Sequence, residues 1–109
     1  MLTVGALNSN STMTTFSSWG PTDDGRIKPD IVTVGASLLS TSAFNAGVAC
    51  DTCYHIDSGT SMSTPVVTGA SALLQELYQK TNGSRSMRSA TLKALLIHTA
   101  EDVGPAGPD

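Results

Sequence analysis

The sequence predicts an α/β fold with few strands and two helices, and three segments indicate it. Residues 31–34 are a continuous apolar, β-branched run, which is typical of a strand covered on both faces. From residue 62 onward apolar side chains recur at helical spacing, and residues 86–99 repeat that pattern on one face. A strand covered on both faces needs helices and parallel neighbours reached by crossovers. We therefore expect the chain to be one edge of a larger α/β domain.

Strands and loops are predicted over residues 1–58. A short apolar run at residues 2–6 favours a strand, and it ends in a turn rich in Asn and Ser. The stretch 20–30 combines two Pro, two Gly and adjacent acidic residues, which predicts a surface loop. That loop leads into the strand at residues 31–34.

Beyond residue 37 the pattern is less regular. Residues 38–41 favour a further strand. From residue 42 to residue 57 the order of side chains is irregular and includes both cysteines and His55. We expect a loop there, with a short strand over residues 54–56.

Two helices follow these strands. The first is predicted over about residues 61–80, ending at Asn82 and Gly83. Its helically spaced residues are Val66, Ala70, Leu73 and Leu77. The second is predicted over about residues 86–99, with leucines on one face and Lys93 pointing outward. The last nine residues, 101–109, predict a turn.

Composition excludes several classes of function. Charged residues make up 14% of the chain and the net charge is −3, whereas an average soluble domain has roughly 25% charged residues. Aromatic residues are 5%, and Lys and Arg are spread along the chain, so neither a basic stripe nor a set of stacking rings is available for nucleic acid. No apolar run approaches the roughly 18 residues that cross a bilayer. We expect no nucleic-acid partner and no membrane span.

The first predicted helix is apolar on more than one side, because Val67, Ala72 and Leu74 lie off its main face. Such a helix is stable when other elements pack against several of its faces. A chain of 109 residues forms only one modest hydrophobic core. We expect the chain alone to expose part of this helix and to cover it by self-association with a second copy.

The sequence GTSMSTP, residues 59–65, stands where the irregular segment meets the first helix. A serine at a helix start lies near the positive end of the helix dipole, and its backbone N–H has no partner within the helix. Gly59 permits close approach of chain or substrate. Pro65, at about the end of the first turn, loses little by lacking an N–H. This layout suits Ser61 as a nucleophile whose N–H binds an oxyanion.

An alternative is that Ser61 merely caps the helix, since Ser is a common N-cap residue. A catalytic serine needs a base that takes its proton. The two histidines, His55 in the irregular segment and His98 near the end of the second helix, are poor candidates for that base. On spacing alone the cap is favoured.

Residues 59–70 resemble the nucleophile signature of the subtilisin-like serine proteases, the subtilase family. Further motifs occur in the order found in that family, so that the resemblance covers nearly the whole chain. They are Val4-Gly5-Ala6, Phe16-Ser17-Ser18, Gly20-Pro21, Gly25-Arg26, Lys28-Pro29-Asp30, Lys93-Ala94-Leu95-Leu96 and Thr99-Ala100. The family's GTS motif aligns Gly59 and Thr60 with the residues that support the nucleophile.

The resemblance implies the C-terminal part of a doubly wound, parallel-sheet catalytic domain. Ser61 would form the acyl-enzyme, and its backbone N–H would be one donor of the oxyanion hole. In the family the catalytic Asp, the catalytic His and the oxyanion-hole Asn all precede the matched region, so Asn8, Asn10 and Asn45 do not inherit that role. We expect a secreted serine endopeptidase acting on polypeptides, with the chain itself inactive. The alternative is a pseudoprotease or a structural fragment that lacks the Asp and His of the triad.

Two departures from the family pattern stand out. Thr33-Val34-Gly35 replaces Ala-Pro-Gly, and Val66 follows Pro65 where subtilisin itself has His. Neither changes the nucleophile. Calcium is bound by many relatives for stability, so it is an option for the full-length protein. Asp23 and Asp24 in a loop are more often solvated charges than calcium ligands, and no metal site is predicted in this chain.

Cys50 and Cys53 form a CxxC pair with several readings: a local disulfide, free thiols, half of a zinc site or a redox pair. A redox pair normally opens a helix, whereas residues 54–59 separate this pair from the predicted helix. A zinc site lacks its second pair of ligands. A structural disulfide or free thiols are therefore favoured. The nucleophile elbow GxSxG of the α/β-hydrolases is excluded, because residue 63 is Ser.

Overall fold

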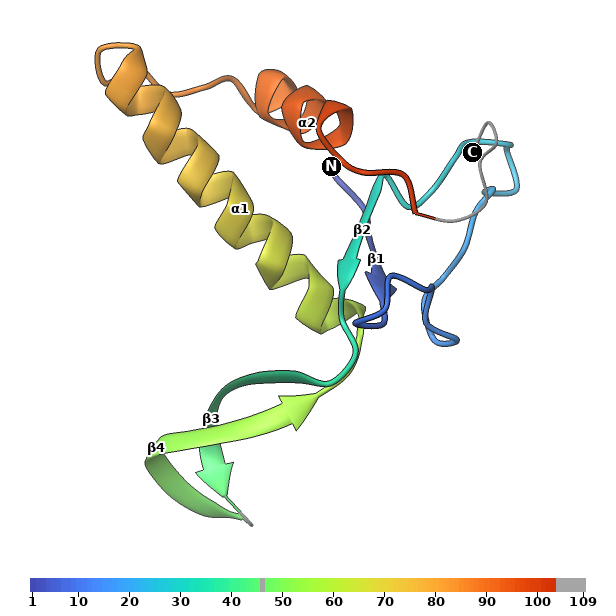
Figure 1. Ribbon diagram of the computed structural model, residues 1–109, viewed down its shortest axis with the longest axis vertical. Coiled ribbons are helices and arrows are strands. Elements are labelled where there is room, and N and C mark those ends of the chain that lie inside the picture. Colours follow the sequence, from blue (N-terminus) through green and yellow to red (C-terminus); the bar gives the residue numbers. More distant parts are fainter. Residues whose placement is uncertain (46, 104–109) are drawn as a thin grey trace.

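The computed structural model describes residues 1–45 and 47–103, and strands precede helices along the chain (Figure 1). The elements are β1 (Val4–Leu7), β2 (Ile31–Val34), β3 (Leu38–Asn45), β4 (Val48–Asp57), α1 (Thr60–Thr81) and α2 (Ser89–His98). The turn predicted at the end of the chain falls mostly on residues 104–109, which lie outside the described residues.

β1 and β2 pair in parallel along their full length, which agrees with the predicted parallel sheet. Their connection, residues 8–30, is a loop rather than a helix. It folds back onto β1, where the N–H of Thr14 donates to the carbonyl of Ala6 at 3.1 Å and Ser17 Oγ accepts from the N–H of Ala6 at 3.0 Å. Both side chains are buried, so the N–H and the carbonyl of Ala6 in β1 are satisfied by the loop that follows the strand.

α1 packs against both strands of this sheet, and α2 lies beside the start of β1 (Figure 1). The buried apolar residues of the described chain are Ala6, Leu7, Val67 and Leu96. The radius of gyration is 16.5 Å, against about 13 Å for a compact domain of this length. The chain is therefore a small, open α/β arrangement, as the fold class predicted.

Much of the apolar surface of α1 has no cover within the described residues. Leu73 is 69% exposed, Leu77 is 58% exposed and Val66 is 44% exposed. These residues belong to the helically spaced apolar set of α1, which the sequence predicted to be partly exposed in this chain alone. β2 is likewise only half-buried, because within the described chain helix α1 and strand β1 are its main neighbours.

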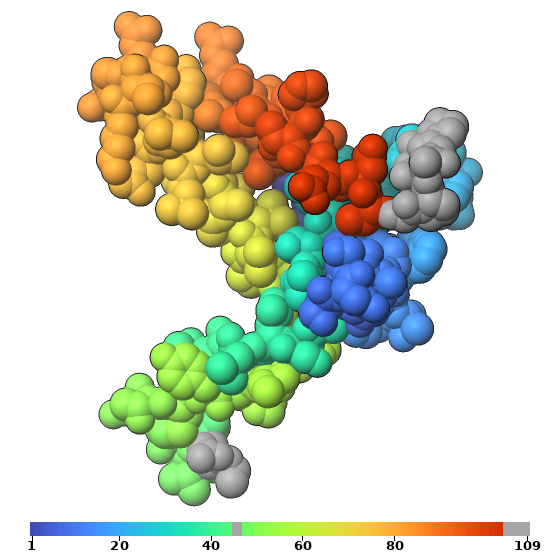
Figure 2. Space-filling model, viewed as in Figure 1, coloured from blue at the N-terminus to red at the C-terminus, as the bar shows by residue number. Residues whose placement is uncertain are grey.

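The segment expected to be a loop over residues 42–57 is instead part of a long hairpin, so the predicted loop was wrong, whereas the short strand predicted over residues 54–56 lies within β4. β3 and β4 pair antiparallel from Leu38–Asp57 outward, and the hairpin stands out from the rest of the chain (Figure 2). The tip includes Gly47 with φ +84°, a conformation that favours glycine. Antiparallel pairing depends on cross-strand contacts rather than on the order of side chains in one strand, which is why local pattern missed it.

A bulge interrupts this hairpin and explains the irregular pattern. Ser42 pairs with Cys53 and Phe44 pairs with Ala49, so residues 50–52 of β4 lie opposite Ala43 of β3. Extra residues in one strand break the alternation of faces. The alternation that marks a strand is therefore lost where the two cysteines stand.

The helix ends differ slightly from those predicted. α1 ends at Thr81, and the N–H of Asn82 bonds to the carbonyl of Tyr78 at 2.9 Å, before Gly83 turns the chain with φ +64°. α2 begins at Ser89 rather than near residue 86, because Arg88 is extended with ψ 143°. These ends follow from backbone conformation at single residues, which periodicity does not report.

Candidate active site

Ser61 is the second residue of α1 and is exposed. The residue at the N-cap position is Gly59, with no side-chain capping bond. The interpretation of Ser61 as the helix cap is therefore wrong, and its hydroxyl makes no capping hydrogen bond. A serine in this position projects from the helix start while its backbone N–H is one of those without an intrahelical partner.

Backbone hydrogen bonds hold the turn before α1 against the end of β2. The N–H of Gly59 donates to the carbonyl of Gly35 at 2.8 Å, and the carbonyl of Gly59 accepts from the N–H of Met62 at 3.0 Å. Thr60 is half-buried at the same turn. Ser61 thus lies directly beyond the carboxyl end of a parallel strand, which is where open α/β sheets place their sites.

The electrostatics of this turn favour negative charge. α1 is 22 residues long and carries no acidic residue in its first turn. Its dipole is equivalent to about half a positive charge at the N-terminus. The N–H of Ser61, in the first turn at this positive end, therefore belongs to the kind of backbone donor that stabilises an oxyanion.

Pro65 lies deeper in the helix than predicted. α1 begins at Thr60 and contains Pro65 as its sixth residue, so Pro65 stands after the first turn and not at its end. An ordinary residue there would donate its N–H to the carbonyl four residues earlier, which belongs to Ser61. Proline cannot donate that bond, and the Ser61 carbonyl is left without its helical partner.

A groove of about 550 Å³ lies beside Ser61, between the first turns of α1 and the hairpin. Its residues include Ser61, Met62 and Pro65 of the helix and Ser40, His55 and Asp57 of the hairpin. Ser40 is paired with His55, so the two share one face of the hairpin. Tyr54 and Ile56, the two neighbours of His55 along β4, are exposed and do not line the groove. Ser61 thus lines an open groove between the helix and the hairpin.

Neither histidine bonds to Ser61 among the described residues. His55 lines the groove but lies on an exposed part of β4, and His98 is exposed at the end of α2. The asparagines that can be described are used elsewhere: the side-chain amide of Asn8 donates to Thr12 Oγ1 at 3.0 Å, and Asn10 Oδ1 accepts from that hydroxyl. Within the described chain Ser61 therefore has no base.

The two cysteines form a disulfide in the structure. Cys50 and Cys53 are joined with their Cα atoms 5.6 Å apart, and both belong to β4. Fully extended residues at this spacing would lie about 10 Å apart. The bridge therefore spans the bulge at residues 50–52, and neither thiol is free for zinc or redox chemistry in this state.

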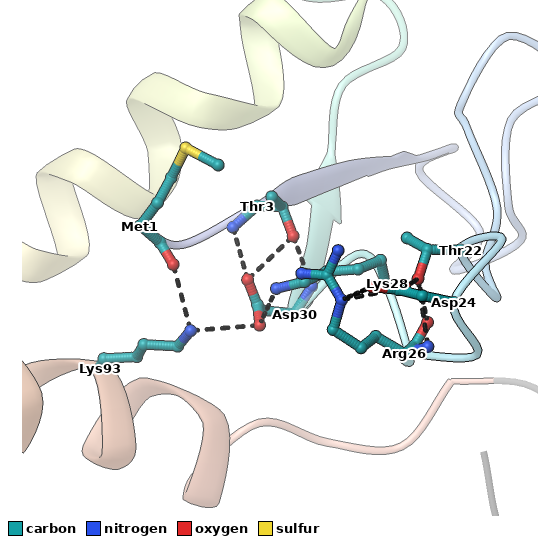
Figure 3. A network of polar contacts seen from close by, with 8 residues as sticks. All are labelled: Met1, Thr3, Thr22, Asp24, Arg26, Lys28, Asp30 and Lys93. Carbon is teal, nitrogen blue, oxygen red and sulfur yellow. Dashed lines mark hydrogen bonds and ion pairs between the residues drawn. The ribbon is translucent and has the colours of Figure 1, made fainter.

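Asp30 is the centre of a polar network that the sequence reading did not predict (Figure 3). Its carboxylate accepts from the N–H of Thr3 at 2.7 Å, from Lys28 Nζ at 2.6 Å and from Lys93 Nζ at 3.3 Å. Lys28 and the Thr3 N–H hold the pKa of Asp30 well below its ordinary range. Lys93 also donates to the carbonyl of Met1 at 3.1 Å. Lys93 therefore ties α2 to the sheet instead of pointing outward as predicted.

Asp24 lies in the loop of residues 20–30, next to Asp23. Its carboxylate bonds to Thr22 Oγ1 and pairs with Arg26 Nε at 2.8 Å, and these partners lower its pKa. Three or more His, Cys, Asp or Glu residues do not cluster anywhere in the described ranges. Of the helices described, neither is long and apolar enough to cross a membrane.

Comparison with known proteins identifies the family. The model of the subtilase family matches residues 1–109, the whole chain. The chain belongs to the subtilase family. A solved subtilase-like structure, the CspB protease of Clostridium perfringens, superimposes with a TM-score of 0.77 and 31% identity, over 96% of this chain and 22% of that chain.

Curated relatives of this subtilase segment are also proteases. The C5a peptidase of Streptococcus pyogenes is 46% identical over 71 residues, which are 65% of this chain and 6% of that protein. The serine protease AprX of Bacillus subtilis is 36% identical over 88 residues, or 68% of this chain and 20% of that protein. The chain thus spans a small part of the length of the relatives it matches.

Proposed function

We propose that the protein containing this segment is a serine endopeptidase that hydrolyses peptide bonds through an acyl-enzyme on Ser61. The observation that carries the proposal is the position of Ser61. It is exposed, it follows the N-cap Gly59 at the positive end of a long helix, and it opens into a groove beside the hairpin. Membership of the subtilase family supports the same reaction.

In this reaction Ser61 Oγ attacks the carbonyl carbon of the substrate and its proton passes to a histidine. The histidine then protonates the leaving amine as the C–N bond breaks, and an ester remains on Ser61. Water hydrolyses the ester and restores the serine. During both steps the Ser61 N–H donates to the negatively charged oxygen. The histidine, its orienting aspartate and a second oxyanion donor would come from the upstream part of the catalytic domain.

The segment by itself is proposed to be inactive. Ser61 has no base among the described residues, and an unassisted serine is a weak nucleophile. The upstream part of the domain is therefore the partner that completes the site, and extended polypeptides are the proposed substrates. Disulfides form and persist in oxidising compartments. The disulfide Cys50–Cys53 therefore supports the proposal that the protein is secreted.

The test is labelling with a fluorophosphonate probe, which esterifies an activated serine. The full-length protein and the isolated 109-residue chain are treated in parallel, and mass spectrometry locates the modified residue. Labelling of Ser61 in the full-length protein alone is the expected result. An unlabelled full-length protein would leave the pseudoprotease as the correct function. Labelling of the isolated chain would show that a base lies within it.

A further inference from the structure

Ser63 differs from the other hydroxyl residues of α1 in where its hydroxyl bonds. Thr64, Thr68 and Ser71 each donate to a carbonyl four residues earlier in the same helix. Ser63 instead donates across to the carbonyl of Thr33 in β2, at 3.3 Å. Its side chain is fully buried, with 0% exposure. A fully buried hydroxyl has no water to replace a lost partner.

Gly35 makes this contact feasible. A Cβ at residue 35 would overlap Ser63 Oγ and would lie 2.8 Å from the carbonyl oxygen of Gly59 and 2.9 Å from Ala6 Cβ. Real Cβ atoms do not approach other atoms so closely. The end of β2 and the first turn of α1 therefore meet with no side chain from residue 35 between them, which leaves room for the Ser63 hydroxyl. Ser63 and Gly59 anchor the turn on either side of Ser61.

We infer that Ser63 is a positioning residue for Ser61, and the inference rests on the proposed peptidase function. Ser61 is exposed, so its own side chain does little to hold it in place. The hydrogen bonds Ser63–Thr33 and Gly59–Gly35 fix the backbone two residues on either side of it. Displacement of a reacting group by about 1 Å can cost about a hundredfold in rate. Ser63 thus acts on the chemical step and not on substrate binding.

The experiment uses the full-length protein and two variants, Ser63→Ala and the matched control Ser71→Ala. Ser71 is a half-buried serine of the same helix whose hydroxyl bonds within α1 at 2.7 Å. Steady-state hydrolysis of a peptide substrate gives kcat and KM. Active-site titration with the fluorophosphonate probe counts the folded, competent enzyme, so that misfolding does not imitate a catalytic effect.

Per titrated site, we expect Ser63→Ala to lower kcat about tenfold with KM changed less than about twofold. Ser71→Ala should leave both values within about twofold of wild type. An unchanged kcat in Ser63→Ala, or an equal loss in Ser71→Ala, would overturn the inference while the peptidase function stands. A wild-type protein with neither turnover nor labelling would overturn both.

Discussion

The backbone N–H of Gly59 donates a 2.8 Å hydrogen bond to the carbonyl of Gly35. This bond joins two residues that are far apart in sequence, and it sets the start of α1 at the carboxyl end of β2. The candidate nucleophile stands two residues beyond it. The position of Ser61 is therefore decided by the sheet as much as by its own helix.

Ser61→Ala in the full-length protein should abolish fluorophosphonate labelling and lower kcat by about a millionfold, because the acyl-enzyme cannot form. Ser9→Ala, in an exposed loop, is the control and should retain wild-type turnover. Hydrolysis of casein and of a short peptide measures both. Turnover surviving in Ser61→Ala would identify a different nucleophile.

Gly35→Ala should destabilise the protein by about 1–3 kcal/mol or more, because the new methyl group overlaps Ser63 Oγ and crowds Gly59. Gly69→Ala is the control, since its Cβ meets nothing within 4 Å among the described residues and alanine favours a helix by about 1 kcal/mol. Thermal melting compares the two. Adding Ser63→Ala to Gly35→Ala should recover part of the loss, and strict additivity would argue against this contact.

Asp30→Asn should cost about 1–3 kcal/mol at pH 7, because a side chain that is 12% exposed loses its negative charge beside Lys28 and one of the two oxygens that accept from Lys28 and Thr3. The pKa of Asp30 is lowered in the folded state, so its stabilisation is present above the unfolded value of about 3.9. It is lost as pH falls below that value toward the folded pKa. Urea unfolding at pH 7 and pH 3 should show the difference between wild type and variant shrinking.

Asp24→Asn is the comparison, because Asp24 bonds to one threonine and one cation, whereas Asp30 bonds to one threonine and two lysines. The Asp24 side chain is 60% exposed, and exposed ion pairs contribute little. We expect a smaller loss than for Asp30→Asn. Equal losses would mean that burial of Asp30 has no energetic role.

Reduction of the Cys50–Cys53 disulfide should destabilise the hairpin by about 2 kcal/mol, as expected for a loop this short. The effect should be local, because the bridge lies within β4 and spans only the bulge. Limited proteolysis should show new cleavage between residues 38 and 57 after reduction. The Cys50→Ser/Cys53→Ser variant should be cleaved at the same sites without reductant. Thiol alkylation of the unreduced protein is the check: modified cysteines would contradict the bridge.

The isolated chain should self-associate, because Leu73 is 69% exposed and Leu77 is 58% exposed on α1 and exposed apolar patches drive association. Sedimentation should find dimers or larger species, and Leu73→Glu/Leu77→Glu should shift the chain toward monomer. Leu39→Glu, on the hairpin, is the control. Monomeric wild type, or dissociation only in the control, would refute association through α1.

Local pattern determined much of this protein. The strand at residues 31–34 follows from its continuous apolar, β-branched run, and α1 follows from the helical spacing of its apolar residues. The motif GTSMSTP indicated Ser61 as a nucleophile through its resemblance to the subtilase signature, again without any contact information. Such features depend on neighbours within a few positions in sequence, and so they can be read before the chain is folded.

Contacts between distant parts of the chain account for the remaining features. Pairing of β3 with β4, the approach of Ser63 to Thr33 and the bond from Lys93 to Asp30 join residues that are distant in sequence. No local propensity encodes such contacts, since a strand or a buried hydroxyl is stabilised by the partner that folding brings to it. The serine motif and its family resemblance therefore indicated the candidate nucleophile, while tertiary contacts determined where it lies and which bonds hold it there.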